Sequence, residues 1–219
     1  MQANADGGPK VYTRREWGAG APRRQPRLLD RPPDHIIVHH TASPNASDTS
    51  RAHAFALSRQ IQRFHMAGRG WDDIGEQLTI SRGGFVMEGR AGSLRAIARN
   101  GLVVGAQSLH HNQHTLGIEN EGTYIKDEVP GRLWKSLTEV CAWLCTAHNL
   151  DPAVAIVGHR DYNSTDCPGD VLYRRLPRLR KEVAHLMGRG AGDPGGDDDT
   201  SEDPRRVLLS HRRHRTAKH

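Results

Sequence analysis

Two short apolar runs of this chain end in side chains that can bind a metal ion. Residues 36–43 read IIVHHTAS and include two adjacent histidines, while residues 157–170 read VGHRDYNSTDCPGD and place a cysteine eight residues after a histidine. Short apolar runs bounded by turn residues are typical of buried strands. Any fold for this chain must therefore account for imidazole and thiol groups at the ends of two separate strands.

Helical patterns lie between and after these runs. Three longer segments have the apolar spacing of amphipathic helices: 43–70, 132–150 and 170–187. The first opens with turn and cap residues and is expected to stop at Gly68. In the third, Pro177 is expected early in the helix, where its missing N–H is tolerated.

Further strand patterns alternate with these helices. Residues 77–90 alternate apolar and polar side chains around RGG, which predicts a β-hairpin. The other predicted strands are 102–107, 115–122 and 155–161. Strands mixed with three helices predict a single α/β domain, in which a mixed central β-sheet is flanked by about three helices. Residues 12–33, rich in Pro and Arg, are expected to cross the surface as an extended arm.

The two ends of the chain differ in composition from its middle. A chain of 219 residues suits one domain of ordinary size plus a tail. We expect residues 1–10 to be a disordered N-terminus and residues 11–187 to form the domain. Residues 188–219 are first rich in Gly and Asp and then basic, which predicts a disordered tail.

The net charge of +6 suits an anionic partner. Nucleic acid and a bacterial wall rich in carboxylates and phosphates are the two candidates. Aromatic residues make up only 5% and are not interleaved with basic ones, so we expect no nucleic acid. No apolar run approaches the length of a membrane span. The first ten residues lack the apolar segment of a secretory signal, which leaves two alternatives: a cytoplasmic protein, or an exported one whose signal was removed.

The chain has three cysteines, and this odd number argues against a disulfide framework. Cys141 and Cys145 lie four residues apart in a helical pattern and are expected to pack in the core, with a disulfide between them as the alternative. Cys167 stands alone in a loop, followed by Pro and Gly. Its thiol is therefore free for another role.

A catalytic zinc site uses three protein ligands of the imidazole, thiolate or carboxylate type and keeps a fourth position open. His159, Cys167 and one of His39 or His40 would make such a set. Because neighbours on a strand point to opposite faces, only one of the two adjacent histidines can be a ligand. The other reading is a core histidine, and the spacing alone leaves the choice open.

Six motifs identify a family when they are taken together. They are REWGA, IIVHHTA, IQRFHMAGRGWDDIG, GGFVMEGR, VVGAQ with HNQHTLGIENEG, and VGHRDYNSTDCPGDVLY. In this order they resemble the zinc-dependent N-acetylmuramoyl-L-alanine amidases of type 2, whose fold is shared with the peptidoglycan recognition proteins. The resemblance covers residues 11–187, and six motifs in order are far more specific than any one of them.

The resemblance implies one zinc ion per chain, held by His39, His159 and Cys167, with His40 facing away. The implied reaction is hydrolysis of the amide between N-acetylmuramic acid and the L-alanine of the stem peptide, a step of peptidoglycan catabolism and cell-wall lysis. Zinc in such a site polarises the carbonyl and activates water near neutral pH. Thr165, where relatives carry Thr or Lys, is implied to steady the oxyanion with one hydrogen bond.

Two departures from the family pattern concern the residues around the water. Many relatives read DIGYxF where this chain reads DIGEQL, so that Glu76 replaces a tyrosine that assists the water. Many also read GAH where this chain has Gln107. GIENEG resembles the branch whose general base is the first Glu of that motif, here Glu119. We expect Glu119 to be the base and keep Glu76 as its competitor.

Several residues are candidates for substrate binding. His65 and Asn112 match family positions that line the substrate groove. Trp71 follows a Gly-rich turn and is either a packing residue or a sugar platform. Arg90 and Glu88 either meet the peptide or form an ion pair at the end of the hairpin.

Two functions remain from different classes. The first is a zinc amidase; the alternative is a recognition protein that binds peptidoglycan without cutting it. Relatives of the second kind typically lose the zinc cysteine, so the retained Cys167 favours the enzyme. We expect a monomer that binds peptidoglycan or muropeptides, outside the cell or attached to the wall, with the cytoplasm as the alternative. His110, His111 and His114 are expected to be exposed loop histidines.

Overall fold

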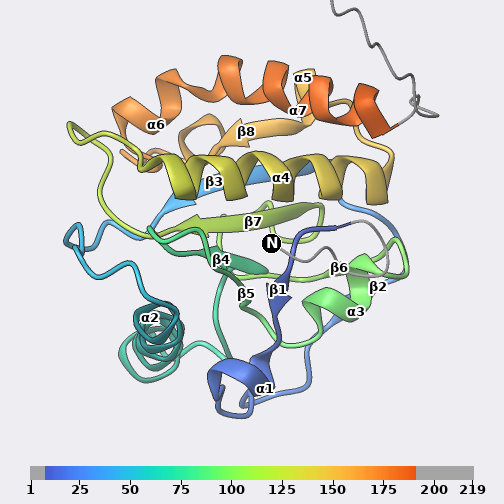
Figure 1. Cartoon of the computed structure of the whole chain (residues 1–219). Coiled ribbons are helices and arrows are strands. Elements are labelled where there is room, and N and C mark those ends of the chain that lie inside the picture. Colours follow the sequence, from blue (N-terminus) through green and yellow to red (C-terminus); the bar gives the residue numbers. More distant parts are fainter. Residues whose placement is uncertain (1–7, 191–219) are drawn as a thin grey trace, which may run out of the picture.

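The computed structural model describes residues 8–190, and its centre is a six-stranded sheet in the order β1-β5-β4-β7-β3-β8 (Figure 1). Only β4 and β5 run antiparallel, and the other neighbours are parallel. The strands are β1 (Val11–Tyr12), β3 (His35–His40), β4 (Leu78–Ile80), β5 (Val86–Glu88), β7 (Thr115–Asn120) and β8 (Ile156–Gly158). The predicted mixed sheet and its hairpin are confirmed.

Helices cover both faces of this sheet. In Figure 1, α4 crosses in front of β3, α7 lies at the top beside β8, and α1 and α2 lie at the bottom. The three predicted helices correspond to α2, α4 and α7, and shorter helices connect the strands. The helices are α1 (Arg14–Trp17), α2 (Arg51–Arg63), η1 (Phe64–Gly68), α3 (Ser93–Ile97), α4 (Gly131–His148), α5 (Pro152–Ala155), η2 (His159–Asp161), α6 (Asp170–Arg174) and α7 (Leu176–Gly190).

Alternation along the strands separates two cores. Val86 of β5 belongs to the large core, which also holds the buried faces of α4 and α7. The next residue, Met87, belongs to a smaller core with Trp17, Ala54 and Ile74. This follows because successive side chains of a strand point to opposite faces.

Cys141 and Cys145 are buried in the large core as free thiols. Their predicted packing role is confirmed, and a disulfide between them is wrong. Burial raises the pKa of the Cys145 thiol to about 12, so it stays protonated and apolar at neutral pH.

The expectation of an extended surface arm over residues 12–33 is wrong for its first part. Thr13 and Glu16 form a capping box that starts α1, in which the Glu16 carboxylate accepts the Thr13 backbone N–H at 2.7 Å. Trp17 is fully buried, and its indole N–H donates to the Glu88 carbonyl at 2.8 Å. Farther along, β2 (Leu28–Leu29) pairs with β6 (Leu102–Val103) in a separate two-stranded sheet. The segment therefore anchors itself to the domain.

The helix predicted over 170–187 is divided into α6 and α7 at Arg175. Pro177 lies at the start of α7, as expected, but it has no N–H to donate and its ring crowds the carbonyl four residues back. A continuous helix through this point is therefore disfavoured.

The predicted terminal segments fall largely outside the described residues, which exclude 1–7 and 191–219. Residues 188–190 continue α7. Within residues 8–190, no helix combines the length and the apolar character needed to cross a membrane.

Candidate metal centre

Parallel pairing aligns polar side chains in one row across the sheet. His39 of β3 pairs with Glu119 of β7, which pairs with Thr79 of β4. His40 takes the opposite face, where its Nδ1 accepts the backbone N–H of Tyr124, a residue of the large core, at 3.2 Å. Of the two adjacent histidines, only His39 therefore shares a face with the row.

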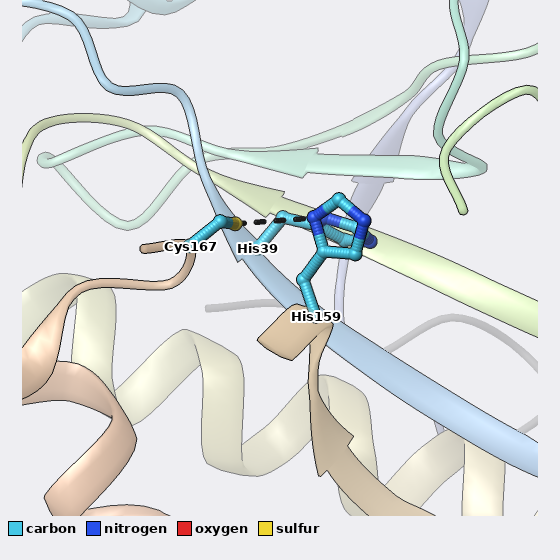
Figure 2. Close-up of side chains that lie close together, drawn as sticks. All are labelled: His39, His159 and Cys167. Atoms are coloured by element: carbon cyan, nitrogen blue, oxygen red, sulfur yellow. Dashed lines mark hydrogen bonds between the residues drawn. The ribbon is translucent and has the colours of Figure 1, made fainter. Parts of the chain in front are cut away.

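Three potential metal ligands converge at the carboxyl ends of β3 and β8 (Figure 2). His39 comes from β3, His159 opens η2 directly after β8, and Cys167 comes from the loop before α6. One ligand atom of each lies within 4.8 Å of the others, and His39 Nδ1 is 3.7 Å from Cys167 Sγ. Two imidazoles and a thiol are a donor set that suits zinc, with a fourth position left open.

The tautomer of His39 follows from a chain of hydrogen bonds. The Thr115 hydroxyl donates to the His111 carbonyl at 2.8 Å, so it accepts from the amide nitrogen of Gln107, also at 2.8 Å. The Gln107 oxygen consequently faces His39 and accepts its Nε2–H at 2.6 Å. His39 Nδ1 therefore keeps its lone pair, which faces the Cys167 sulfur at 3.7 Å and can accept its S–H.

His159 is held in the same manner. Its Nε2 lies 3.1 Å from the Asn163 side-chain oxygen, which also accepts the Ser108 hydroxyl at 2.7 Å. The Asn163 amide nitrogen donates to the Leu109 carbonyl at 3.3 Å, which fixes its orientation. Each imidazole thus donates Nε2–H to an amide oxygen and keeps Nδ1 for a metal, the arrangement by which outer partners orient metal ligands.

Burial sets the protonation of the three donors. Burial, aided by the nearby His159, lowers the pKa of His39 to about 4, and burial also lowers the pKa of His159. Both rings are therefore neutral at pH 7, as metal ligation requires. Burial and the Glu119 carboxylate raise the pKa of the Cys167 thiol. A bound dication would reverse this shift, because a coordinating thiol loses its proton.

Two buried carboxylates lie beside these donors. Glu119 and Glu76 are only 7% and 5% exposed, and both interact electrostatically with Cys167. Burial and the charge of Glu76 raise the pKa of Glu119 well above its ordinary value. Among the described residues, Glu76 Oε2 has no hydrogen-bond partner; His65 Nδ1 lies 3.9 Å away but accepts the Gly75 N–H. A buried acceptor without a donor needs a partner from outside the chain, such as water or substrate.

Comparison with known proteins gives the family. The family described as N-acetylmuramoyl-L-alanine amidase matches residues 29–170, which include all three converging donors. The chain belongs to this amidase family. The N-acetylmuramoyl-L-alanine amidase of Sus scrofa is 34% identical over 191 residues, or 84% of this chain and 30% of its own length. The human amidase is 35% identical over 173 residues. The chain spans less than a third of the length of each of these two relatives.

Solved structures show the same fold. Drosophila peptidoglycan-recognition protein LB superimposes with a TM-score of 0.66 at 28% identity, covering 76% of this chain and 92% of that one. Peptidoglycan recognition protein LE, solved in complex with tracheal cytotoxin, gives a TM-score of 0.67 at 27% identity over 77% and 92%. The family and the fold expected from the six motifs are confirmed.

In this amidase-family domain, Thr165 lies beside the metal-ligand candidate Cys167, and His65 lies beside the carboxylate of Glu76. The Thr165 side-chain oxygen accepts the Cys167 backbone N–H at 3.2 Å, which leaves its own O–H free to donate. His65 Nδ1 accepts the Gly75 N–H at 3.2 Å. The His65 ring packs in a tilted arrangement against Trp71, with centroids 4.7 Å apart, and Trp71 is half-buried.

Asn112 supports the loop that carries Gln107. Its side-chain oxygen accepts the backbone N–H groups of Gln107 and Ser108 at 2.7 and 3.1 Å. The Asn112 oxygen therefore already has partners within the chain. Its predicted place in a substrate groove stays a prediction.

Arg90 is half-buried beside the segment that precedes β4. Its guanidinium donates to the Ile74 carbonyl at 2.7 Å. The Glu88 carboxylate accepts the Leu94 N–H at 3.1 Å, and within residues 8–190 no Glu88–Arg90 ion pair forms. The alternative of an ion pair at the end of the hairpin is therefore wrong.

Sequence reasoning missed the two residues that orient the imidazoles. Gln107 stood out only as a departure from the family pattern, and Asn163 was not singled out at all. The one local signal was the spacing of Asn163, four residues after His159. The expectation that His111 and His114 are simply exposed is also wrong, because both are half-buried against the Tyr162 ring.

Proposed function

We propose that this domain hydrolyses the amide between N-acetylmuramic acid and the L-alanine of peptidoglycan. The observation that carries the proposal is the convergence of His39, His159 and Cys167 beside two buried carboxylates, with Nε2 of each imidazole held by an amide oxygen. A protein that only binds peptidoglycan has no need of such a donor set.

His39 Nδ1, His159 Nδ1 and the Cys167 sulfur would hold one zinc ion. When bound there, zinc would supply a Lewis acid that polarises the scissile carbonyl and activates water. The chain's own contribution is to keep both imidazoles neutral, to aim them through Gln107 and Asn163, and to donate the His40 N–H to the sulfur at 3.3 Å.

Glu119 is proposed as the general base, which takes a proton from the attacking water and passes it to the leaving amine. The positive charge of a bound dication opposes the effect of burial and of Glu76 on the pKa of Glu119, so that the carboxylate can be ionised in use. Glu76 is the competing candidate for the same task. The free O–H of Thr165 would donate to the oxyanion.

The proposed substrate is peptidoglycan or a soluble muropeptide, bound by a monomer outside the cell or at the wall. Support comes from the recognition protein LE, whose solved complex contains monomeric diaminopimelic acid-type peptidoglycan. His65, Trp71, Asn112 and Arg90 are proposed to contact the glycan or the peptide. The alternative function is recognition without cleavage, as relatives named peptidoglycan-recognition proteins keep it open.

The test uses a defined muropeptide, chromatography of its products and zinc analysis after dialysis against a weak chelator. We expect about one retained zinc per chain and release of the intact stem peptide. Cys167→Ala should lose both the zinc and the cleavage but still bind the muropeptide. Zinc uptake together with muropeptide binding, without any cleavage by the unaltered protein, would favour recognition instead.

A further inference from the structure

A second group of potential metal ligands lies at the other end of β3. Asp34, His35 and His114 each offer one ligand atom, and these atoms lie within 4.8 Å of one another. His35 Nδ1 and His114 Nδ1 both lie 2.8 Å from the same oxygen of Asp34. Two imidazoles therefore share one carboxylate in a compact group, which we call the Asp34 triad.

The backbone holds this triad in place. The Asp34 N–H donates to the His114 carbonyl at 2.9 Å, which joins the start of β3 to the residue before β7. Next to it, Arg31 donates to the Gln113 carbonyl at 3.1 Å. His35 and Thr115 are paired in the parallel sheet. The three side chains are thus assembled by regular structure, which lowers the entropy lost when an ion binds.

The side chains of His111 and Tyr162 pack beside the triad. His114 Nε2 lies 3.1 Å from His111 Nδ1, so one ring can donate to the other. If His114 donates its Nε2–H there, its Nδ1 keeps a lone pair for a metal, which is the role that outer partners play for metal ligands. The Tyr162 ring lies 4.3 Å from that of His111 and 5.8 Å from that of His35.

We propose that the Asp34 triad binds a divalent transition-metal ion of the zinc type, separately from the amidase centre. Two imidazole nitrogens and a carboxylate oxygen are ligands that zinc accepts, and the ion would replace the protons now shared with Asp34. The side chains of Asp34, His35 and His114 are 59%, 31% and 30% exposed, so an ion and its remaining water ligands have direct access.

The two centres differ in ways that an experiment can separate. His35 opens β3, and His39 lies four residues on, roughly 13 Å away at the rise of a strand. The triad has no thiolate, and its exposure predicts weaker binding than at the buried centre. Tyr162 follows η2 and precedes Asn163, so a metal at the triad would also restrain the segment that carries His159.

The test is a Co²⁺ titration of the metal-free full-length chain, followed by absorption spectroscopy. The first equivalent should produce the near-ultraviolet charge-transfer band of a cobalt–thiolate bond. A second, more weakly bound Co²⁺ equivalent should add only visible absorption bands, as expected for cobalt bound by nitrogen and oxygen ligands. In Cys167→Ser the cobalt–thiolate band should vanish while the visible bands of the second site remain. Failure of the amidase centre would therefore not imitate failure of the triad.

Variants at the triad then decide the assignment. Asp34→Asn and, separately, His114→Gln should each weaken binding of the second Co²⁺ equivalent at least about 100-fold. The loss of a direct ligand should exceed that of an outer partner, which alone costs about 10–100-fold in metal affinity. His185→Gln removes an exposed histidine of α7 and should leave both equivalents unchanged. Uptake of one equivalent only, or a second equivalent that survives Asp34→Asn in a chain with unchanged circular dichroism, overturns the proposal.

Discussion

Gln107→Leu is the substitution that best tests how the centre is organised. The Gln107 side-chain oxygen accepts His39 Nε2–H at 2.6 Å, and Gln107 is 6% exposed, so water has little access to this bond. Leucine has a similar volume but no acceptor. We expect the substitution to leave the His39 N–H without a partner and to free the ring to turn or to change its tautomer.

The substitution should change two separate quantities. A buried donor that loses its acceptor lowers the free energy of unfolding by about 1–3 kcal/mol. Loss of an outer partner of a metal ligand typically costs about 10–100-fold in metal affinity, which is about 1.4–2.8 kcal/mol at 1.4 kcal/mol per factor of ten. We therefore expect zinc affinity to fall about 10–100-fold, in addition to the loss of stability. Gln107→Glu, whose charged acceptor binds Nε2–H more strongly, should keep or raise the affinity.

The assay is competition for zinc between the metal-free protein and a chromophoric chelator at fixed pH. Gln62→Leu is the matched control. Gln62 is also buried, and its side chain bonds Gly20 and Asp73 away from the metal centre. It should lower the free energy of unfolding without changing zinc affinity. If Gln107→Leu binds zinc within about twofold of the unaltered protein, less than the 10–100-fold expected of an outer partner, the orienting role of Gln107 is refuted.

Three further predictions concern single side chains. Glu119→Gln should lower single-turnover cleavage by about 10²–10⁴-fold at unchanged zinc content, whereas Glu76→Gln should cost about tenfold or less; the reverse order would make Glu76 the base. His40→Ala should keep its zinc, measured by metal analysis, yet lose about 1–3 kcal/mol of stability in urea because the Tyr124 N–H loses its acceptor. Burial lowers the pKa of His148 to about 4, so the unfolded chain binds more protons between about pH 6.5 and 4. Stability should therefore fall by about 2 kcal/mol as the pH drops through this window, and His148→Gln should flatten the dependence seen in urea titrations at several pH values.

The parts of the fold that sequence predicts are those with local signals. The alternation of a strand was enough to show that His39 and His40 face opposite sides, and the pattern around RGG was enough for the hairpin. The start of α1 could have been predicted as well, because Thr13 and Glu16 have the spacing of a capping box. It was overlooked because the Pro and Arg content of the segment outweighed that one signal.

The parts that sequence did not predict depend on contacts between distant segments. Gln107 meets a histidine 68 positions earlier, and His114 meets Asp34 across 80 positions. No periodicity within one segment records such a pair. The role of Asn163 required knowing which nitrogen of His159 is held by a hydrogen bond, and only the structure shows this.

The geometry also gives a physical account of both departures from the family pattern. An amide oxygen accepts an N–H as an imidazole nitrogen does, so Gln107 can orient His39 where relatives have histidine. Glu76 is different, because it adds a second buried carboxylate beside Glu119 and the Cys167 sulfur. Without a cation, Glu119 and the Cys167 thiol keep their protons, because burial and neighbouring charge raise the pKa of both groups. A bound dication would favour the ionised form of both. We therefore expect the departure at Glu76 to make the ionisation of Glu119 depend more strongly on a bound metal ion.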